Sequence, residues 1–194
     1  MPAYSRYCLD IYLIRHTSPA IATGICYGQS DIDVSSSFET EATNVLTKLP
    51  NLAEAVIYSS PLKRCQRLAE KLGQPYLLDP RLMELNFGMW ELQHWHEIDR
   101  AALDAWGESY VTSCPPEGES YAMLYARSVA FLDELKSSLA TEIIVVTHRG
   151  IICSLLVQIL KLPLEKAFDF HIDYGSVSKF TLEGDSAKVI YLNR

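Results

Sequence analysis

Short apolar runs alternate along this chain with segments in which apolar residues recur at helical spacing. The runs are rich in β-branched residues and stop at polar ones, which is typical of buried strands. They predict strands over 9–14, 55–58, 75–78 and 142–147, and a terminal hairpin formed by 176–182 and 188–192. The periodic segments predict helices over 38–49, 92–106, 122–139 and 151–160, and one more that starts near Pro61 and ends at Gly73. Strands separated by helices predict an α/β protein, a three-layer α/β/α sandwich around a mostly parallel central sheet.

Length and charge narrow the range of partners. The 194 residues, of which 48% are hydrophobic and 21% charged, fit one globular domain spanning 1–194. The formal net charge of −7 lacks the basic field that nucleic-acid binding requires. We therefore expect no nucleic-acid partner, and we expect local groups to hold any anionic ligand. The sequence carries no signal for an oligomeric state.

Cysteine usage and the apolar stretches bear on the compartment. The five cysteines are scattered and form no Cys-x-x-Cys pair, which argues against a disulfide framework and a thiolate zinc site. The first ten residues lack the apolar stretch of a secretion signal. Apolar stretches such as 143–146 and 151–160 fall short of the ~20 residues that a membrane span needs. We expect a cytoplasmic protein that contacts no membrane.

Polar side chains follow three of the predicted strands. Arg15 and His16 come after the first strand, Ser60 after the second with Arg64 shortly beyond it, and His148 after the fourth. Ligands of open α/β sheets bind beyond the carboxyl ends of the strands, so these side chains are expected to share one pocket. Arginine makes bidentate hydrogen bonds to phosphate oxygens, and a phosphate group is therefore the predicted ligand. A neutral histidine in such a pocket could attack phosphorus as a nucleophile.

A metal site is a weaker interpretation of the histidines. The arginines near His16 and His148 would repel a cation, and no carboxylate pair stands beside them in the sequence. His94 and His96 form a His-x-His pair, yet on the predicted helix their side chains would point roughly 200° apart. We therefore predict neither a metal ion nor another cofactor.

Four blocks of sequence carry a resemblance to a known family. They are Leu13–Thr17 (LIRHT), Ser59–Arg64 (SSPLKR), Leu82–Glu91 (LMELNFGMWE) and Val145–Gly150 (VVTHRG). In this order, and spread over most of the chain, they resemble the histidine phosphatase superfamily, which has the phosphoglycerate-mutase-like fold. The Phe-Gly-x-Trp-Glu segment and the stretch 171–176 (HIDYGS) are similar to the α-ribazole-5′-phosphate phosphatases of cobalamin assembly.

The resemblance implies a role for each of four side chains at the expected pocket. His16 would be the nucleophile that becomes phosphohistidine, while Arg15, Arg64 and His148 would hold the phosphoryl oxygens. Phosphoryl transfer depends mainly on positioning and on the stabilisation of charge, and this set agrees with both demands.

The resemblance also implies an acid and a loop. Glu84 would protonate the leaving alkoxide and then deprotonate the attacking water. Tyr27 and Gly28 match a glycine-containing loop that approaches the phosphate in this family, where a backbone N–H would add a donor. The family chemistry demands no metal.

Purely structural roles are the alternatives for several residues. Glu84 could form a surface ion pair with Arg81, Lys63 or Arg67. Cys65 stands beside Arg64, which would lower a thiol pKa, but a buried inert thiol is the favoured interpretation. Core packing is likewise favoured over stacking on a flat substrate for the three tryptophans, Trp90, Trp95 and Trp106.

These observations together predict a metal-independent phosphomonoesterase that acts on a small-molecule phosphate ester through a phosphohistidine. The resemblance implies that it hydrolyses α-ribazole 5′-phosphate to α-ribazole in cobalamin nucleotide-loop assembly. Hydrolysis is favoured over phosphoryl transfer because 194 residues leave little room for the insertion that encloses the ligand in mutases. One alternative is a broad-specificity phosphatase of sugar phosphates or nucleotides. An alternative of another class is a catalytically silent phosphate-binding regulatory protein.

Overall fold

A six-stranded sheet forms the centre of the computed structural model, which describes residues 8–184 and 186–194. The strands lie in the order β3-β2-β4-β1-β5-β6. Their bounds are β1 Cys8–Arg15, β2 Val56–Ser59, β3 Tyr76–Leu78, β4 Glu142–Thr147, β5 Val177–Glu183 and β6 Ser186–Tyr191. Neighbours among β3, β2, β4 and β1 pair in parallel, whereas β5 runs antiparallel to both β1 and β6. The predicted mostly parallel sheet and the terminal hairpin are confirmed.

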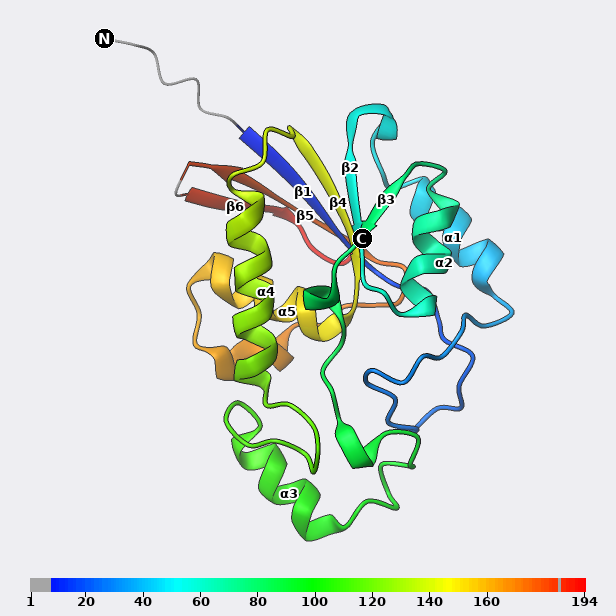
Figure 1. The fold of residues 1–194 in the computed structure, drawn as a ribbon, viewed down its shortest axis with the longest axis vertical. Coiled ribbons are helices and arrows are strands. Elements are labelled where there is room, and N and C mark those ends of the chain that lie inside the picture. Colours follow the sequence, from blue (N-terminus) through cyan, green and yellow to red (C-terminus); the bar gives the residue numbers. More distant parts are fainter. Residues whose placement is uncertain (1–7, 185) are drawn as a thin grey trace.

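Helices cover both faces of the sheet, and Figure 1 shows α3 apart from it, beyond one end. The α-helices are α1 Phe38–Leu46, α2 Lys63–Lys71, α3 Arg100–Ser109, α4 Tyr121–Leu135 and α5 Arg149–Leu160. Short 3₁₀ helices span Leu52–Glu54, Pro80–Leu82, Gly88–Trp90 and Leu164–Asp169. α1 and α2 cover one face, and α4 and α5 cover the other. The three-layer sandwich predicted from the sequence is therefore confirmed.

The side chains of the central strands divide between two hydrophobic cores. In β1, Tyr12 and Ile14 are buried in the core that α1 and α2 close, while Ile11 and Leu13 are buried in the core under α4 and α5. Successive side chains of a strand point to opposite faces, so a sheet that is covered on both faces needs a continuous apolar run. This arrangement explains why the strand signal in the sequence was a run rather than an alternation.

The helix predicted over 92–106 is wrong in its first half, because α3 begins only at Arg100. The preceding backbone pairs instead with a distant segment, and the Trp95 N–H donates to the Gly24 carbonyl at 2.9 Å. Leu92 has a φ of 66°, a left-handed conformation that an α-helix does not accommodate. Hydrogen bonds to residues far away in the sequence therefore override the local helical spacing.

Two other helices are shorter than their spacing predicts. α1 ends at Leu46 rather than at residue 49, and α4 ends at Leu135 rather than at residue 139. α2 stops two residues before Gly73, whose φ of 71° turns the chain away from the helix. The predicted order of elements is otherwise the observed order.

Strand register brings the candidate residues to one edge of the sheet. Arg15 at the end of β1 lies opposite Thr147 at the end of β4, and Ser59 at the end of β2 lies opposite Val146. β4 stands between β2 and β1, so the three loops that follow these strands are neighbours.

Candidate active site

His16 lies directly after β1 and is 1% exposed. Its Nδ1 is 2.7 Å from the carbonyl oxygen of Thr17. A carbonyl can only accept, so Nδ1 carries the proton and Nε2 keeps its lone pair. That Nε2 accepts a hydrogen bond from Nε of Arg64 at 3.3 Å. The backbone thus fixes the tautomer that nucleophilic attack from Nε2 requires.

Arg64, in the first turn of α2, is fully buried. Its Nη1 donates to the Ser30 carbonyl at 2.9 Å, and its Nη2 donates to the Gly28 carbonyl at 2.7 Å and to Nδ1 of His148 at 3.3 Å. The ion pairs found among the described residues do not include this guanidinium. Its charge is therefore solvated by neutral groups and remains available to an anion.

Arg15 adds a second guanidinium at the end of β1. Its Nη1 donates to the Ile172 carbonyl at 2.6 Å, and its Cζ lies 3.7 Å from the ring centroid of Tyr174. Its Nε is buried and has no hydrogen-bond partner among the described residues. This arginine likewise takes part in none of the ion pairs of the described chain, so two positive charges meet here without a counter-charge.

His148 follows β4 and completes the group, with its ring centroid 5.0 Å from that of His16. A guanidinium can only donate, so Nδ1 of His148 accepts from Arg64 and Nε2 carries the proton. Nε2 lies 2.8 Å from Oγ of Ser60, which accepts that proton's hydrogen bond. Sequence reasoning placed these side chains in one pocket, and the structure brings them together.

Burial and nearby charge keep both imidazoles neutral. Burial lowers the pKa of His16 well below 6.5, and the positive charges of Arg64 and Arg15 lower it further. The pKa of His148 is lowered by burial first and then by Arg64. Cys65 is fully buried, as predicted, and burial raises its pKa to about 12, so this thiol stays protonated.

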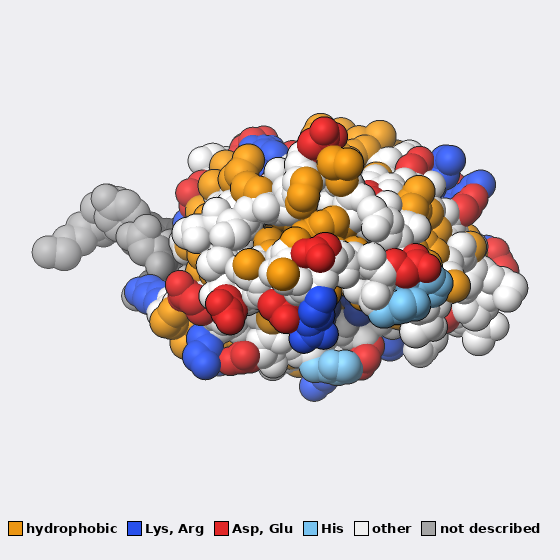
Figure 2. All heavy atoms as spheres, turned by 90° about the horizontal axis from the view of Figure 1, so that it is seen from below, with side chains coloured by type: hydrophobic (Ala, Val, Ile, Leu, Met, Phe, Trp, Pro, Cys, Tyr) orange, Lys and Arg blue, Asp and Glu red, His pale blue; other side chains and the backbone are white. Residues whose placement is uncertain are grey.

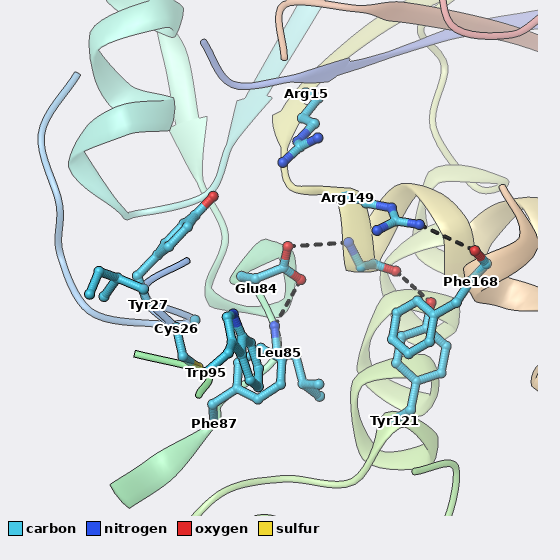
Figure 3. A pocket seen from close by; sticks show the side chains of 13 residues that line it. Arg15, Cys26, Tyr27, Glu84, Leu85, Phe87, Trp95, Tyr121, Arg149 and Phe168 are labelled. Carbon is cyan, nitrogen blue, oxygen red and sulfur yellow. Dashed lines mark hydrogen bonds between the residues drawn. The ribbon is translucent and has the colours of Figure 1, made fainter. Parts of the chain in front are cut away.

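Glu84 faces the group from the loop after β3, below Arg15 in Figure 3. Its Oε1 accepts from the Leu85 N–H at 2.9 Å, and its Oε2 accepts from the Gly150 N–H at 3.2 Å. The alternative that Glu84 forms a surface ion pair is wrong, since the three basic side chains that could serve as its partner form ion pairs with other carboxylates. Arg81 pairs with Asp79 and Glu134, Lys63 with Asp31, and Arg67 with Asp33 and Glu70.

Tyr27 and Gly28 lie against the same pocket. The Tyr27 hydroxyl is 2.7 Å from that of Tyr174, and its ring centroid is 5.1 Å from Cζ of Arg64. Gly28 has a φ of 34°, and a Cβ there would come within 2.2 Å of Oε1 of Glu91. Gly28 therefore allows the loop to approach Glu91 while its carbonyl holds Arg64. A contact of its N–H with phosphate stays a prediction.

One family model matches residues 11–194, and it describes the histidine phosphatase superfamily, branch 1. This chain belongs to the histidine phosphatase superfamily. The match covers the four sequence blocks and all the side chains described above. The chain accordingly has the phosphoglycerate-mutase-like fold and is a phosphoric monoester hydrolase.

Similar proteins carry several different substrate names. A Hydrogenobacter thermophilus protein with the provisional name phosphoserine phosphatase 2 is 28% identical, with 95% of each chain covered. The adenosylcobalamin/alpha-ribazole phosphatase of Escherichia coli is 26% identical over 95% of this chain and 96% of its own. The solved structure of a mycobacterial glucosyl-3-phosphoglycerate phosphatase matches with a TM-score of 0.84, at 26% identity, over 96% of this chain and 99% of that one. These relatives agree on the class of reaction and differ in the alcohol.

The pocket of this histidine phosphatase has one polar end and one aromatic end. It has a volume of about 170 Å³, and Arg15, Glu84 and Arg149 line it together with apolar residues. The aromatic part of its lining consists of Tyr27, Phe87, Trp95, Tyr121 and Phe168. Figure 2 shows hydrophobic, acidic and basic side chains interspersed on the face at the α3 end of the molecule.

All three tryptophans pack on one small core, as predicted, with Trp95 and Trp106 partly buried against it. Trp90 is 6% exposed and packs with Cys26 and Ile98 in this core. Trp95 also reaches the pocket. Sequence reasoning missed Arg149, which follows His148 directly and whose place after β4 was the available signal.

The interpretation of His94 and His96 needs a correction. They lie before α3 rather than on it, and their ring centroids are 4.8 Å apart instead of pointing away from each other. Within residues 8–184 and 186–194, no three His, Cys, Asp or Glu side chains gather in a way that could hold a metal ion. In the same part of the chain, no helix is both long and apolar enough to cross a membrane.

The electrostatics of His16 can be tested by nuclear magnetic resonance. We expect ¹⁵N shifts to show a protonated Nδ1 and an unprotonated Nε2 at pH 6.5, because burial, Arg64 and Arg15 all lower the pKa of this imidazole. Arg15→Met removes one positive charge and should move the titration of His16 to higher pH. The control Arg100→Met changes an exposed arginine on α3 and should leave it unmoved. A His16 that is half protonated at 6.5 or above would contradict the assignment.

The contact between Gly150 and Glu84 allows a test of whether the position of the Glu84 carboxylate matters for activity. A Cβ at position 150 would lie 2.1 Å from Oε1 of Glu84, so Gly150→Ala should displace the carboxylate while the backbone keeps its fold. We expect kcat/KM for alkyl phosphate esters to fall about tenfold or more, since a positioned general acid contributes ~10²–10⁴-fold. Gly107→Ala is the control, because nothing lies within 4 Å of the added Cβ. Equal rates for Gly150→Ala and the unmodified protein would count against the proposed contact.

Proposed function

We propose that this protein hydrolyses small phosphate monoesters through a phosphohistidine at His16, without a metal ion. The observation that carries the proposal is a pair of guanidiniums, Arg15 and Arg64, that flank a neutral imidazole and form no ion pair with a carboxylate of residues 8–184 or 186–194. Two positive charges offset a phosphate dianion, and the imidazole supplies a lone pair directed from Nε2. We take residues 1–194 to act as one catalytic domain.

The first half-reaction forms the phosphoenzyme. Nε2 of His16 attacks phosphorus, a P–N bond forms, and the bond from phosphorus to the ester oxygen breaks. Glu84 in its protonated form gives its proton to the leaving alkoxide. Arg15 and Arg64 stabilise the charge on the phosphoryl oxygens as it spreads in the transition state, and His148 contributes by turning its Nε2–H from Ser60 to one of these oxygens.

The second half-reaction returns the free enzyme. Glu84, now a carboxylate, accepts a proton from a water molecule, whose oxygen attacks phosphorus as the P–N bond breaks. The electron pair returns to Nε2 of His16, and inorganic phosphate leaves. The backbone hydrogen bonds to Glu84 from Leu85 and Gly150 support this double use, because they hold the carboxylate at one place in both steps.

Removal of the nucleophile tests the proposal. His16→Ala should abolish turnover and the transient acid-labile labelling of the protein by a ³²P-phosphate ester. His171→Ala, which changes a histidine whose side chain is 81% exposed, should retain both. More than a trace of activity in His16→Ala would overturn the proposed nucleophile. If the unmodified protein releases one equivalent of alcohol and then stops, the result would favour the catalytically silent phosphate-binding protein instead.

α-Ribazole 5′-phosphate is the substrate that we propose first, within cobalamin nucleotide-loop assembly. Phe87, Trp95 and Tyr121 line the pocket that also contains Arg15 and Glu84. Aromatic rings of this kind stack on a flat heteroaromatic base such as the one α-ribazole carries. The 26% identity with the adenosylcobalamin/alpha-ribazole phosphatase of Escherichia coli supports the same choice. Such a substrate, and five free cysteines, fit a cytoplasmic enzyme.

Arg149 favours a second candidate, an ester that carries a carboxylate, such as phosphoserine. It lines the pocket, and its Nη2 donates to the carbonyls of Phe168 and Phe170 at 3.2 and 3.0 Å. A guanidinium held in place near the alcohol end would recognise a carboxylate. The relative with the phosphoserine phosphatase name has 28% identity. A broad-specificity phosphatase of sugar phosphates or nucleotides stays the third possibility.

A substrate panel with two variants separates these candidates. If the alcohol is α-ribazole, the unmodified enzyme should prefer its phosphate over phosphoserine, sugar phosphates and nucleotides in kcat/KM. Trp95→Leu should then lower that value about tenfold while Arg149→Met changes it little, since one aromatic contact is worth roughly 0.5–1.5 kcal/mol beyond its area. The reverse pattern would favour phosphoserine. Similar kcat/KM values across the panel would favour the broad-specificity enzyme.

A further inference from the structure

Arg127 of α4 gathers the backbone carbonyls of the loop that carries Glu84. Its Nη1 donates to the carbonyls of Arg81 at 2.7 Å and Met83 at 2.5 Å. Its Nη2 donates to the carbonyl of Glu84 itself at 2.9 Å. One side chain therefore fixes three peptide groups in the stretch that ends at the proposed acid.

Glu119 holds this arginine in place. Its Oε2 accepts from Nε of Arg127 at 3.2 Å, and its Oε1 accepts from Nη2 at 2.6 Å. Both side chains are largely buried, with 19% of Arg127 and 13% of Glu119 exposed. Oε1 of Glu119 also accepts from the backbone N–H of Asn86 at 3.0 Å. The pair thus binds the backbone on both sides of Glu84.

The carboxylate of Glu84 depends on this backbone for its direction. One of its oxygens is held by the N–H of Leu85, the next residue in the same loop, and the other by the N–H of Gly150. A shift of the loop would move the carboxylate away from both N–H groups. Residues 83–87 lie between two short 3₁₀ helices and belong to neither a helix nor a strand, so side chains hold this stretch in place. Gln29 also donates from Nε2 to the Glu84 carbonyl at 2.9 Å, but Arg127 is the side chain that binds three carbonyls of the stretch 81–84.

We infer that Arg127, held by Glu119, is a positioning residue that fixes Glu84 for its work as general acid. This inference rests on the proposed function. The planar guanidinium suits the task because its five N–H groups point in different directions and reach three carbonyls and one carboxylate at once. The three donors of a lysine ammonium leave from one atom and do not span these acceptors.

Leaving-group dependence tests the role. An alkoxide needs a proton as it leaves, whereas p-nitrophenolate leaves without one, and kcat/KM reports only steps up to cleavage of the ester bond. Arg127→Met should therefore lower kcat/KM about tenfold or more for α-ribazole 5′-phosphate or another alkyl ester, and less than about threefold for p-nitrophenyl phosphate. Arg127→Lys, which keeps the charge, should show the same selective loss.

The matched control is Arg81→Met. The Arg81 side chain belongs to the same loop and pairs with Asp79 and Glu134, but it does not hold the backbone of Glu84. Arg81→Met should leave the ratio of kcat/KM for the alkyl ester to kcat/KM for p-nitrophenyl phosphate unchanged. In the double variant of Arg127→Met with Glu84→Gln, the loss for the alkyl ester should not exceed that of Glu84→Gln alone, because both changes remove one function.

Two outcomes would overturn the role of Arg127. One is an equal loss on alkyl and aryl esters, and the other is an additive loss in the double variant. If Arg127→Met does not fold, Arg127→Lys and Glu119→Gln give the same comparison with smaller changes. If either outcome is found while phosphohistidine still forms at His16, the role of Arg127 is wrong and the proposed function still stands. Failure of the proposed function itself would appear instead as phosphatase activity retained by His16→Ala.

Discussion

The site depends on one buried cation, the guanidinium of Arg64. Removing a charge from water is costly unless hydrogen bonds replace the lost solvation. Here the replacement comes from the carbonyls of Ser30 and Gly28 and from the ring nitrogens of His16 and His148. All four are neutral acceptors, so they orient the guanidinium without cancelling its charge. A carboxylate in their place would stabilise the same arginine and leave little attraction for a phosphate.

The same charge sets the protonation state of its neighbours. An imidazole nitrogen that accepts a hydrogen bond from a guanidinium cannot carry a proton, and the positive charge disfavours the doubly protonated, charged ring. Burial, reinforced by the charge of Arg64, thus lowers the pKa of His16 and of His148 and keeps both rings neutral. The loop that supplies its carbonyls is held in turn by Glu91, whose carboxylate accepts from the N–H groups of residues 29 and 30. The conformation of the loop around residues 28–30 therefore determines how the guanidinium of Arg64 is held.

The sequence predicts most of this arrangement where local pattern and topology agree. Continuous apolar runs mark strands that are covered on both faces, and parallel strands bring the residues after them to one edge. Arg15, His16, Arg64 and His148 follow from these two facts. The setting of Glu84 does not, because it lies in a loop without periodicity, and the arginine that binds this loop stands 43 residues further along the chain. Segment 92–99 fails for a related reason, since the backbone of residues 92–95 hydrogen-bonds to residues 24–26 instead of continuing a helix.

This division extends to the two ends of the pocket. The proposed phosphate end rests on the sheet, whose central strands are buried in the two large cores, so its geometry depends on the strand register. The proposed alcohol end includes Trp95, which packs on the small core around Cys26 and Trp90, and Phe87, which packs on this core and on the core under α4 and α5. Substitutions in that small core or on its surface can reshape recognition of the alcohol without moving the guanidiniums. Relatives that are all named phosphatases but carry different substrate names are the expected consequence. The residues that select the alcohol are therefore to be sought in the loops that carry these aromatic rings, and not among the residues that directly follow the strands.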